Sequence, residues 1–298
     1  MTWVLTLIAA PGSQSLGPAE IATATDCLEA TGARVSAPRW LAPEEACDIA
    51  FELAASESLE TDLRARFDGQ ALDLAIQPAA GRRKLLLLAD MDATIVAGES
   101  LDELAELAGL KPQIAAITAR AMAGELDFAE ALRTRVALLE GLPVEALEQT
   151  IARLTLNPGA RLLVQTMKRH DAYTALISGG FSPFTSHVRK VCGFDEDRAN
   201  RLLCADGKLT GKVAEPILGR DAKRAALETL LTRRGLTADQ ACTVGDGAND
   251  IDMLCAAGLG VAYHAKPAVR EAAPQRIERG DLTALLYLQG YSLDDFAS

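Results

Sequence analysis

Two carboxylates one residue apart, Asp90 and Asp92, follow the uninterrupted apolar run Leu85–Ala89. A strand that is apolar on both faces is typical of the middle of a parallel sheet covered by helices. Such sheets bind ligands just beyond the carboxyl ends of their strands. Because residues two apart in an extended chain point to the same side, we expect both carboxylates to face that crevice.

Two other predicted strands also end in small or polar residues. Ser178-Gly179-Gly180 follows the predicted strand 173–177, and the run 245–250 (GDGAND) follows the predicted strand 241–244. Each ending on its own is an ordinary turn composition. If the three strands are parallel neighbours, however, their ends converge on one edge of the sheet. The coincidence of three such endings indicates a site.

Together these residue types suit the chemistry of a bound phosphate. Asp90, Asp246 and Asp250 would form an oxygen-rich cluster of the kind that Mg²⁺ prefers. Backbone N–H groups beside small residues can cradle a phosphate, and the Ser178 hydroxyl adds a donor. Lys223, in the first turn of a predicted helix, would bring a positive charge to the phosphoryl oxygens, although a lysine there is normally a solvated helix residue.

A carboxylate beside Mg²⁺ and phosphate can attack phosphorus to form an aspartyl-phosphate, and we assign this role to Asp90. Asp92 would protonate the leaving alcohol and then take a proton from the hydrolytic water. An EF-hand loop that began at Asp90 would need glycine at 95 and glutamate at 101, where the chain has Ile95 and Leu101. Neither a GxxxxGK(S/T) loop nor a complete dinucleotide-binding fingerprint is present.

Composition narrows the class of protein and its partners. The chain has 298 residues, 49% of them hydrophobic, which is enough for more than one domain. Its net charge of −11 argues against nucleic acid or an anionic membrane as a partner. The six cysteines form no CxxC pair, which indicates reduced thiols, and no stretch qualifies as a transmembrane helix. We therefore expect a soluble, cytoplasmic protein that acts on a small molecule.

The first 80 residues are predicted to form a separate α+β domain. We expect strands at 2–9, 33–40, 47–53 and 72–76, and helices at 18–31 and 59–67. This βαββαβ order is the ferredoxin-like arrangement. A linker is expected at 78–84. An exposed sheet of this kind could pair between chains, which would give a homodimer.

Residues 81–298 are predicted to form an α/β domain with a doubly wound parallel sheet, because strands and helices alternate along them. Helices expected at 101–108, 112–123, 128–139 and 143–154 follow the first core strand directly. An all-helical insert at about 98–157 predicts a lid or cap. A hairpin is expected around 206–208, and the last short strand at 260–262.

The motifs resemble those of the haloacid-dehalogenase (HAD) phosphatases over about residues 85–270. The four ordered motifs of that superfamily are matched by Asp90-Met91-Asp92-Ala93-Thr94, Ser178-Gly179, Lys223 and Gly245-Asp246-Gly247-Ala248-Asn249-Asp250. Segments 90–99, 132–136, 177–181, 199–202 and 207–211 further resemble the phosphoserine phosphatases. One position departs from the pattern, because Ala93 stands where this family usually has serine; rate or substrate range could differ as a result.

This resemblance implies a HAD Rossmann-like core with an inserted helical cap, and a specific activity. The activity is Mg²⁺-dependent hydrolysis of O-phospho-L-serine to L-serine and phosphate, the last step of L-serine biosynthesis. The residues implied are Asp90, Asp246 and the backbone carbonyl of Asp92 for the metal; Ser178, Gly179 and Lys223 for the phosphate; Glu99 for the substrate ammonium and Arg135 for its carboxylate; Met122 and Phe128 for the cap side; and Asn249 and Asp250 for support.

Helical periodicity bears on the arginine. Arg135 lies seven residues from Phe128 and three from Leu132, so it belongs to the apolar stripe of its helix, whereas Arg133 lies about 200° away. A guanidinium in an apolar stripe needs a partner, and its planar shape suits a carboxylate. An internal ion pair or a snorkelling side chain is the alternative for Arg135, and a favourable charge at a helix start is the alternative for Glu99.

Two other functions stay open. A phosphatase for phosphohomoserine, phosphothreonine or another small phosphomonoester would carry the same motifs, because one methylene cannot be read from a sequence. A non-catalytic amino-acid sensor is the other, although every motif position holds a competent residue. Residues 1–80 resemble an ACT-type amino-acid-binding module, and a plain structural or dimerisation role fits them equally well.

Overall fold

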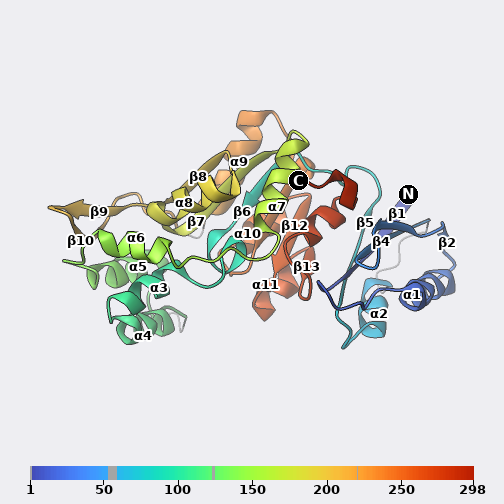
Figure 1. Ribbon diagram of the computed structural model, residues 1–298, viewed down its shortest axis with the longest axis horizontal. Helices are drawn as coiled ribbons and strands as arrows, with labels where there is room; N and C mark the ends of the chain where they lie inside the picture. Colours follow the sequence, from blue (N-terminus) through green and yellow to red (C-terminus); the bar gives the residue numbers. More distant parts are fainter. Residues whose placement is uncertain (1, 53–58, 123–124, 220) are drawn as a thin grey trace.

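The computed structural model describes residues 2–52, 59–122, 125–219 and 221–298. Three units follow one another along its long axis: an N-terminal sheet with two helices, a central parallel sheet, and a mostly helical unit at the far end (Figure 1). Among the helices of the described chain, none has both the length and the apolar character needed to cross a membrane.

The central sheet has six strands in the order β13-β12-β11-β6-β7-β8, and every neighbouring pair is parallel. Its strands are β6 (Leu86–Ala89), β7 (Tyr173–Phe181), β8 (Glu196–Asn200), β11 (Ala241–Gly245), β12 (Leu259–Tyr263) and β13 (Gln275–Ile277). The predicted α/β fold with a parallel sheet is therefore confirmed. The prediction that 260–262 is the last strand is wrong, because β13 continues the sheet; with only three residues, it carries too little pattern to be recognised.

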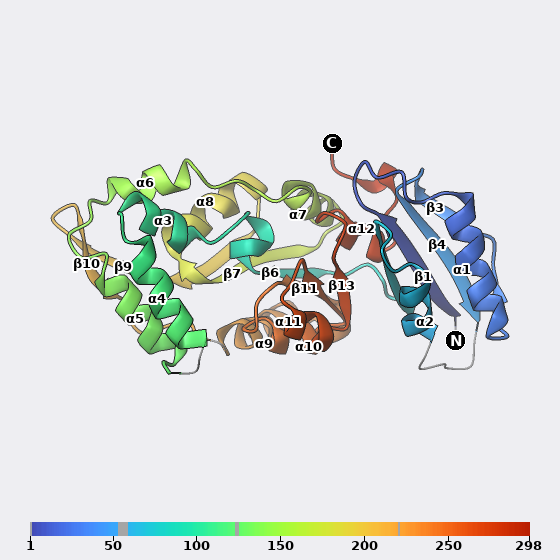
Figure 2. The same ribbon diagram turned by 90° about the horizontal axis from the view of Figure 1, so that it is seen from below.

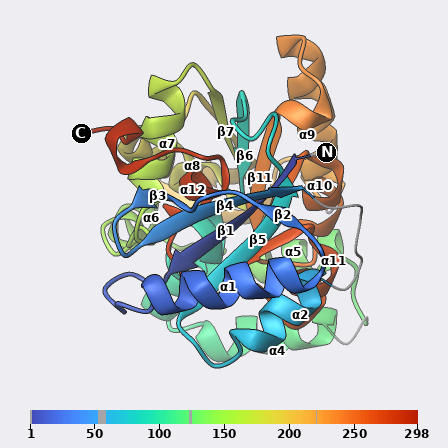
Figure 3. The same ribbon diagram turned by 90° about the vertical axis from the view of Figure 1, so that its right-hand side faces the viewer.

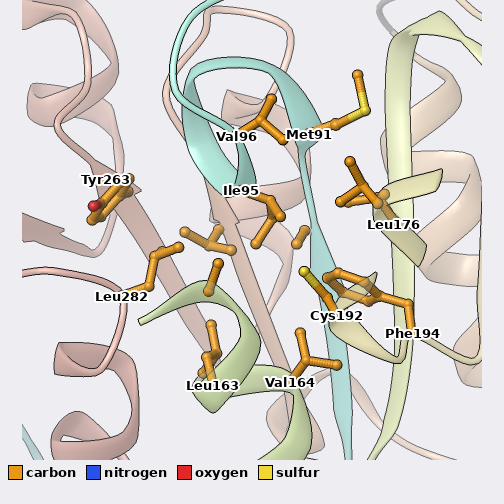
Figure 4. Close-up of a cluster of buried hydrophobic side chains, with 14 of the residues drawn as sticks. Met91, Ile95, Val96, Leu163, Val164, Leu176, Cys192, Phe194, Tyr263 and Leu282 are labelled. Carbon is orange, nitrogen blue, oxygen red and sulfur yellow. The ribbon is translucent and has the colours of Figure 1, made fainter. Parts of the chain in front are cut away.

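Helices cover both faces of this sheet because β6 is apolar on both sides. Leu87 and Ala89 face α7 (Ala160–Arg169), α8 (Ser182–Cys192) and α12 (Ala284–Leu288). Leu86 and Leu88 face α9 (Ala222–Arg234), α10 (Ile251–Ala256) and α11 (Pro267–Ala272). Figure 4 shows how the chain just after β6 joins this core, since Ile95 and Val96 point into the same cluster as Leu163 and Leu282.

The far unit is built from two separate parts of the chain. Its four helices are α3 (Ser100–Leu107), α4 (Lys111–Met122), α5 (Phe128–Ala137) and α6 (Glu145–Ile151). The antiparallel hairpin of β9 (Leu202–Ala205) and β10 (Lys208–Val213) lies against them (Figure 2). Backbone bonds join the two parts: Leu209 donates to Leu142, and Gly141 donates to Leu209. The hairpin was predicted, but its place beside the inserted helices was not.

The N-terminal unit is an antiparallel sheet in the order β2-β4-β1-β5, with β3 also paired to β4. Its elements are β1 (Thr2–Ala9), α1 (Pro18–Ala30), β2 (Arg34–Val35), β3 (Arg39–Ala42), β4 (Ala46–Glu52), α2 (Leu59–Arg66) and β5 (Leu72–Pro78). The single strand expected at 33–40 is divided, because Pro38 lacks a backbone N–H and restricts the residue before it.

Both faces of the N-terminal sheet are covered within the same chain. The helices α1 and α2 pack on one face (Figure 3). On the other face, Ile8, Ala46 and Ala75 share a buried cluster with Leu285 and other residues of the central unit. Figure 2 shows the sheet lying between α1 and α12. The sheet face that we expected to be free for pairing with another chain is thus occupied by the central unit.

Candidate active site

The chain turns sharply as soon as β6 ends. Asp90 extends the sheet through its N–H, which donates to Val244, and its Oδ1 accepts from the N–H of Met91 at 2.7 Å. A wide turn follows, closed by the bond from the N–H of Val96 to the carbonyl of Met91 at 2.9 Å, and within it Ala93 has a φ of 52°, in the left-handed region. The expected extended strand through both carboxylates is therefore not what brings them together. Asp92 reaches the site because its Oδ1 accepts from the N–H of Ser100 at 2.8 Å.

Asp90 forms a buried ionic group with Lys223 and Asp250. Lys223 Nζ lies 2.7 Å from Asp90 Oδ1 and 2.5 Å from Asp250 Oδ1, and all three side chains are almost fully buried. Burial acts to lower the pKa of Lys223, but the two carboxylates outweigh it and raise that pKa to about 12. Burial raises the pKa of Asp90, and the Lys223 charge opposes the rise. Lys223 is thus a fixed positive charge at the nucleophile candidate.

The acidic cluster fits a divalent cation. Carboxylate oxygens of Asp90, Asp246 and Asp250 all lie within 4.8 Å of one another. Three ionised carboxylates with one ammonium would leave two negative charges uncompensated in a buried place, which is costly unless a cation balances them. Both oxygens of Asp250 are engaged, Oδ1 by Lys223 and Oδ2 by the N–H of Gly247. Lys223 and the N–H of Met91 both contact Asp90 through its Oδ1, so Asp90 Oδ2 and the Asp246 carboxylate are best placed to bind such an ion.

Asp92 faces neutral donors instead of a cation. Its Oδ2 lies 3.5 Å from the hydroxyl of Ser178, which in turn accepts from the N–H of Gly180. A Cβ added to Gly180 would lie 2.9 Å from Asp92 Oδ2, so the backbone must be bare at this point. Burial raises the pKa of Asp92, with the N–H of Ser100 opposing the rise. A carboxyl group whose pKa is raised can hold a proton and deliver it.

The helical unit brings further predicted residues to the site. Phe128 lies over the phosphate-loop candidate, because a Cβ on Gly179 would meet its ring at 3.2 Å. Arg135 is half-buried, and in the described part of the chain it forms no ion pair, only a 3.3 Å bond to its own helix. Burial lowers its pKa, while Glu99 and Asp102 oppose that effect. Arg133 is exposed and pairs with Glu215, as expected for the opposite face.

The remaining predicted residues divide into three cases. Glu99 keeps an exposed surface, yet partial burial and the charges of Asp92 and Asp246 raise its pKa to about 7. Asn249 lies in the loop 245–250 after β11, where a Cβ on Gly247 would lie 2.5 Å from its Oδ1. The side chain of Met122 lies outside the described residues.

Three side chains that support the site were not predicted to do so. Thr94 donates from its hydroxyl to Asp246 at 3.1 Å, and Asn157 donates to the carbonyl of Thr94 at 2.8 Å. Asn200 donates to the carbonyl of Gly179 and accepts from the N–H of Leu218, each at 2.8 Å. An asparagine at the end of a segment is an ordinary turn residue, so its type alone gives no signal of these contacts.

Comparison with known proteins identifies the family. The model of the haloacid dehalogenase-like hydrolases matches residues 87–254, more than half of the chain. This protein belongs to that family. The phosphoserine phosphatase of Streptomyces coelicolor is 38% identical over 255 residues, which are 85% of this chain and 62% of that protein. The chain thus spans less than two thirds of the length of that relative.

Two solved structures are similar over different extents. A HAD family hydrolase of Salmonella enterica serovar Typhi, 29% identical, aligns over 97% of this chain and 98% of its own, with a TM-score of 0.83. A phosphoserine phosphatase that holds an analogue of the phospho-aspartyl intermediate is 40% identical. It covers 69% of this chain and 98% of its own, with a TM-score of 0.64. The likeness to the Salmonella protein therefore includes the N-terminal unit.

Proposed function

We propose that this protein is a Mg²⁺-dependent phosphoserine phosphatase that works through an aspartyl-phosphate on Asp90. The observation that carries the proposal is the buried Asp90 carboxylate, 2.7 Å from Lys223 Nζ and part of an acidic cluster at the sheet edge. A nucleophile, a fixed positive charge and metal ligands in one water-poor place suit phosphoryl transfer. A relative at 38% identity and a solved structure at 40% both carry the name of this activity.

The first half-reaction transfers the phosphoryl group to the protein. Asp90 Oδ attacks phosphorus while the bond between phosphorus and the serine oxygen breaks. Asp92 gives its proton to that departing oxygen, which its raised pKa allows. Lys223, the Ser178 hydroxyl and nearby backbone N–H groups stabilise the charge on the phosphoryl oxygens.

The second half-reaction restores the two carboxyl groups. Asp92, now ionised, takes a proton from a water molecule whose oxygen attacks phosphorus. The bond between phosphorus and Asp90 breaks, which releases phosphate and returns Asp90 as a carboxylate and Asp92 as an acid. Phe128, against the backbone of Gly179, helps to exclude bulk water from the site while the covalent bond exists.

Asp90, Asp246 and the backbone carbonyl of Asp92 are the residues that would hold Mg²⁺. When bound, the ion supplies positive charge that favours the ionised form of Asp90 and neutralises a phosphoryl oxygen. The excess of buried carboxylates over ammonium groups supports this assignment. Asp250 orients Lys223, and Asn249 precedes Asp250 in the loop 245–250.

The amino-acid part of the substrate is assigned to Glu99 and Arg135. A half-buried guanidinium without an ion-pair partner among the described side chains is suited to bind a carboxylate in two places. The Glu99 carboxylate lies close enough to Arg135 for its charge to act on the pKa of that guanidinium. We assign Glu99 to the ammonium group of the substrate. A phosphate ester that carries both an ammonium group and a carboxylate on its alcohol part is phosphoserine or a close homologue.

The decisive experiment compares kcat/KM for phosphoserine, phosphohomoserine, phosphothreonine, phosphoethanolamine and p-nitrophenyl phosphate, with Mg²⁺ and with EDTA. We expect phosphoserine to be preferred at least tenfold and activity to vanish with EDTA. A mock purification from cells that lack the protein serves as the control for contaminating phosphatase, and the Asp90→Asn variant tests the covalent route. A preference for another ester would overturn the substrate, and an active Asp90→Asn variant would overturn the covalent route.

We further propose that residues 1–80 form a ferredoxin-like, ACT-type domain and that residues 81–298 form the HAD core, with its cap inserted at about 98–157. The order β1-α1-β2-β3-β4-α2-β5, which becomes βαββαβ when the divided strand β2 and β3 is counted once, and the antiparallel strand arrangement support the first part. The position of the four inserted helices between β6 and α7 supports the second. The β9–β10 hairpin would then complete the cap.

A further inference from the structure

Asp73 of β5 is a buried carboxylate of the N-terminal unit that bonds to the central unit. Only 3% of the residue is exposed. Its two oxygens accept from three successive backbone N–H groups, those of Glu278, Arg279 and Gly280, at 2.8, 3.0 and 2.6 Å. Successive N–H groups that converge in this way bind anions well. Asp73 therefore shapes the loop 278–283, which connects β13 to α12.

The loop 278–283 is in tight contact with the segment that precedes α7. The N–H of Leu282 donates to the carbonyl of Pro158 at 3.1 Å. A Cβ on Gly159 would lie 2.7 Å from the backbone nitrogen of Thr283, so the two segments touch backbone to backbone. A shift of one segment must therefore be shared by the other, because packed interiors leave no room for independent movement.

The segment before α7 in turn holds the catalytic turn. Asn157 donates from Nδ2 to the carbonyl of Thr94 at 2.8 Å, and its own N–H donates to Ile95 at 2.9 Å. The Thr94 hydroxyl donates to Asp246 Oδ1 at 3.1 Å. Every link between Asp73 and this carboxylate is thus a hydrogen bond or a backbone contact.

A second route leads from the same loop to the same carboxylate-bearing residue. His264 donates from Nε2 to the carbonyl of Gly280 at 2.8 Å. Two residues further, the N–H of Lys266 lies 3.4 Å from the carbonyl oxygen of Asp246. Figure 4 shows the apolar packing between the two routes, where Leu282 lies beside Tyr263 and Leu163 and below Ile95.

We propose that Asp73 is a positioning residue for the metal site: acting through loop 278–283, it fixes the position of Asp246 from outside the central unit. Without the carboxylate, three N–H groups would lose their acceptor, and the buried N–H of Gly280 could recover one only if the loop moved. Both routes would carry that movement to Asp246. The proposal rests on the metal-binding role of Asp246 in the proposed function, and it is independent of which phosphomonoester is the substrate.

The test uses two residues of β5 that differ in where they bond. Asp73→Asn keeps the side-chain shape but turns an NH₂ group toward the backbone donors. Gln77→Met is the matched control, because Gln77 is also buried and also crosses between the units, but it donates to Leu288 on α12 at 2.6 Å. Thr94→Val removes the direct bond to Asp246 and sets the scale of the assay, with a loss of about 10- to 100-fold in metal affinity.

Two measurements are made on the full chain. Calorimetric titration with Mg²⁺ should show about fivefold weaker binding for Asp73→Asn and unchanged binding for Gln77→Met. In Asp73→Asn, hydrogen exchange should speed up at 278–283, at 93–98 and at 155–159. In Gln77→Met, exchange in these three segments should be unchanged. Should Asp73→Ala be needed as a stronger variant, it must show the same pattern.

The proposal is overturned if faster exchange in Asp73→Asn stays within 278–283, if Mg²⁺ affinity is unchanged, or if Gln77→Met weakens Mg²⁺ as much. The exchange pattern does not depend on activity. A failed substrate panel with the expected exchange and binding results would therefore reject the proposed function and leave the positioning role intact.

Discussion

At the residue scale, Asp90 and Asp92 are divided by what each one meets. Asp90 contacts the Lys223 ammonium, which favours its ionised form, as a nucleophile requires. Asp92 meets a hydroxyl and an N–H group, and burial raises its pKa without a contacting cation. Burial raises the pKa of both carboxyl groups, so the contact with the Lys223 ammonium, which Asp90 has and Asp92 lacks, is what distinguishes the nucleophile from the acid.

This division predicts a leaving-group effect for Asp92→Asn. The variant should lower kcat for phosphoserine by about 10²- to 10⁴-fold, because no acid protonates the serine oxygen. With p-nitrophenyl phosphate, whose leaving group needs no proton, rapid-quench kinetics should still show a burst of p-nitrophenol followed by slow turnover. Equal loss of the burst with both substrates would show that Asp92 is not the acid.

The two arginines of α5 provide a matched pair for substrate recognition. Arg135→Ala should raise KM for phosphoserine by about tenfold to a hundredfold, as expected when a charge-assisted bond is lost. KM for phosphoethanolamine, which lacks the carboxylate, should hardly change. Arg133→Ala removes only an exposed pair with Glu215, so steady-state kinetics should be unaffected with either substrate.

The raised pKa of Glu99 predicts a pH dependence of substrate binding. Because that pKa is about 7, Glu99 loses its charge as pH falls through this value and with it the attraction for an ammonium group. KM for phosphoserine should therefore rise as pH drops from 8 to 6. A cation bound nearby favours the ionised carboxylate, so it should move the midpoint of the Glu99 titration below 7. In Glu99→Gln the phosphate group still titrates but this component should be absent; an identical KM profile in both proteins would exclude the role.

At the element scale, the sequence predicts the core strands well and the edge strands poorly. Leu86–Ala89 is a continuous apolar run because helices cover both of its faces, so its pattern and its place at the site are both readable. At one sheet edge, Glu196–Asn200 is polar, and at the other, Gln275–Ile277 has three residues. Neither edge strand has the hydrophobic signature on which such predictions depend.

The same reasoning separates the predicted site residues from the missed ones. Residues such as Asp246 and Ser178 follow apolar strands, so local sequence marks them. Asn157 and Asp73 act through hydrogen bonds to residues far away in the chain, and no local pattern encodes such partners. Tertiary packing decides these contacts, and for Asp92 it also replaced the expected strand geometry with a turn.

The end of β11 illustrates how closely the three loops approach one another. A Cβ on Gly245 would lie 2.3 Å from Asp250 Cγ, so Gly245→Ala must push Asp250 away from Lys223. We expect a large loss of kcat and a fall of about 1–3 kcal/mol in the free energy of unfolding, measured in urea. Gly219→Ala is the control near the same site, because its Cβ would meet Phe128 at an ordinary 3.9 Å; a comparable loss there would show that any added methyl is harmful.

At the scale of the whole molecule, a second buried carboxylate joins the N-terminal and central units. Arg82 Nη1 lies 2.5 Å from Asp48 Oδ2, with side-chain exposures of 10% and 8%. The same guanidinium donates to the carbonyls of Tyr287 and Leu288 on α12. Arg82 thus neutralises a charge in one unit and satisfies the backbone of the other, so the two units should unfold together.

This arrangement predicts an asymmetric response to mutation. Arg82→Met leaves Asp48 buried and unpaired, which should cost about 3–5 kcal/mol of unfolding free energy, whereas adding Asp48→Leu should recover part of that loss. Arg34→Met, which breaks the exposed pair with Glu52 in the same N-terminal unit, should change the free energy of unfolding little.

Urea unfolding followed by both circular dichroism and Trp fluorescence can show whether the two units unfold together, because both tryptophans, Trp3 and Trp40, lie in the N-terminal unit. Coincident transitions in the unaltered chain are expected if the units are coupled, and a separate early fluorescence transition would mean that the N-terminal unit unfolds on its own.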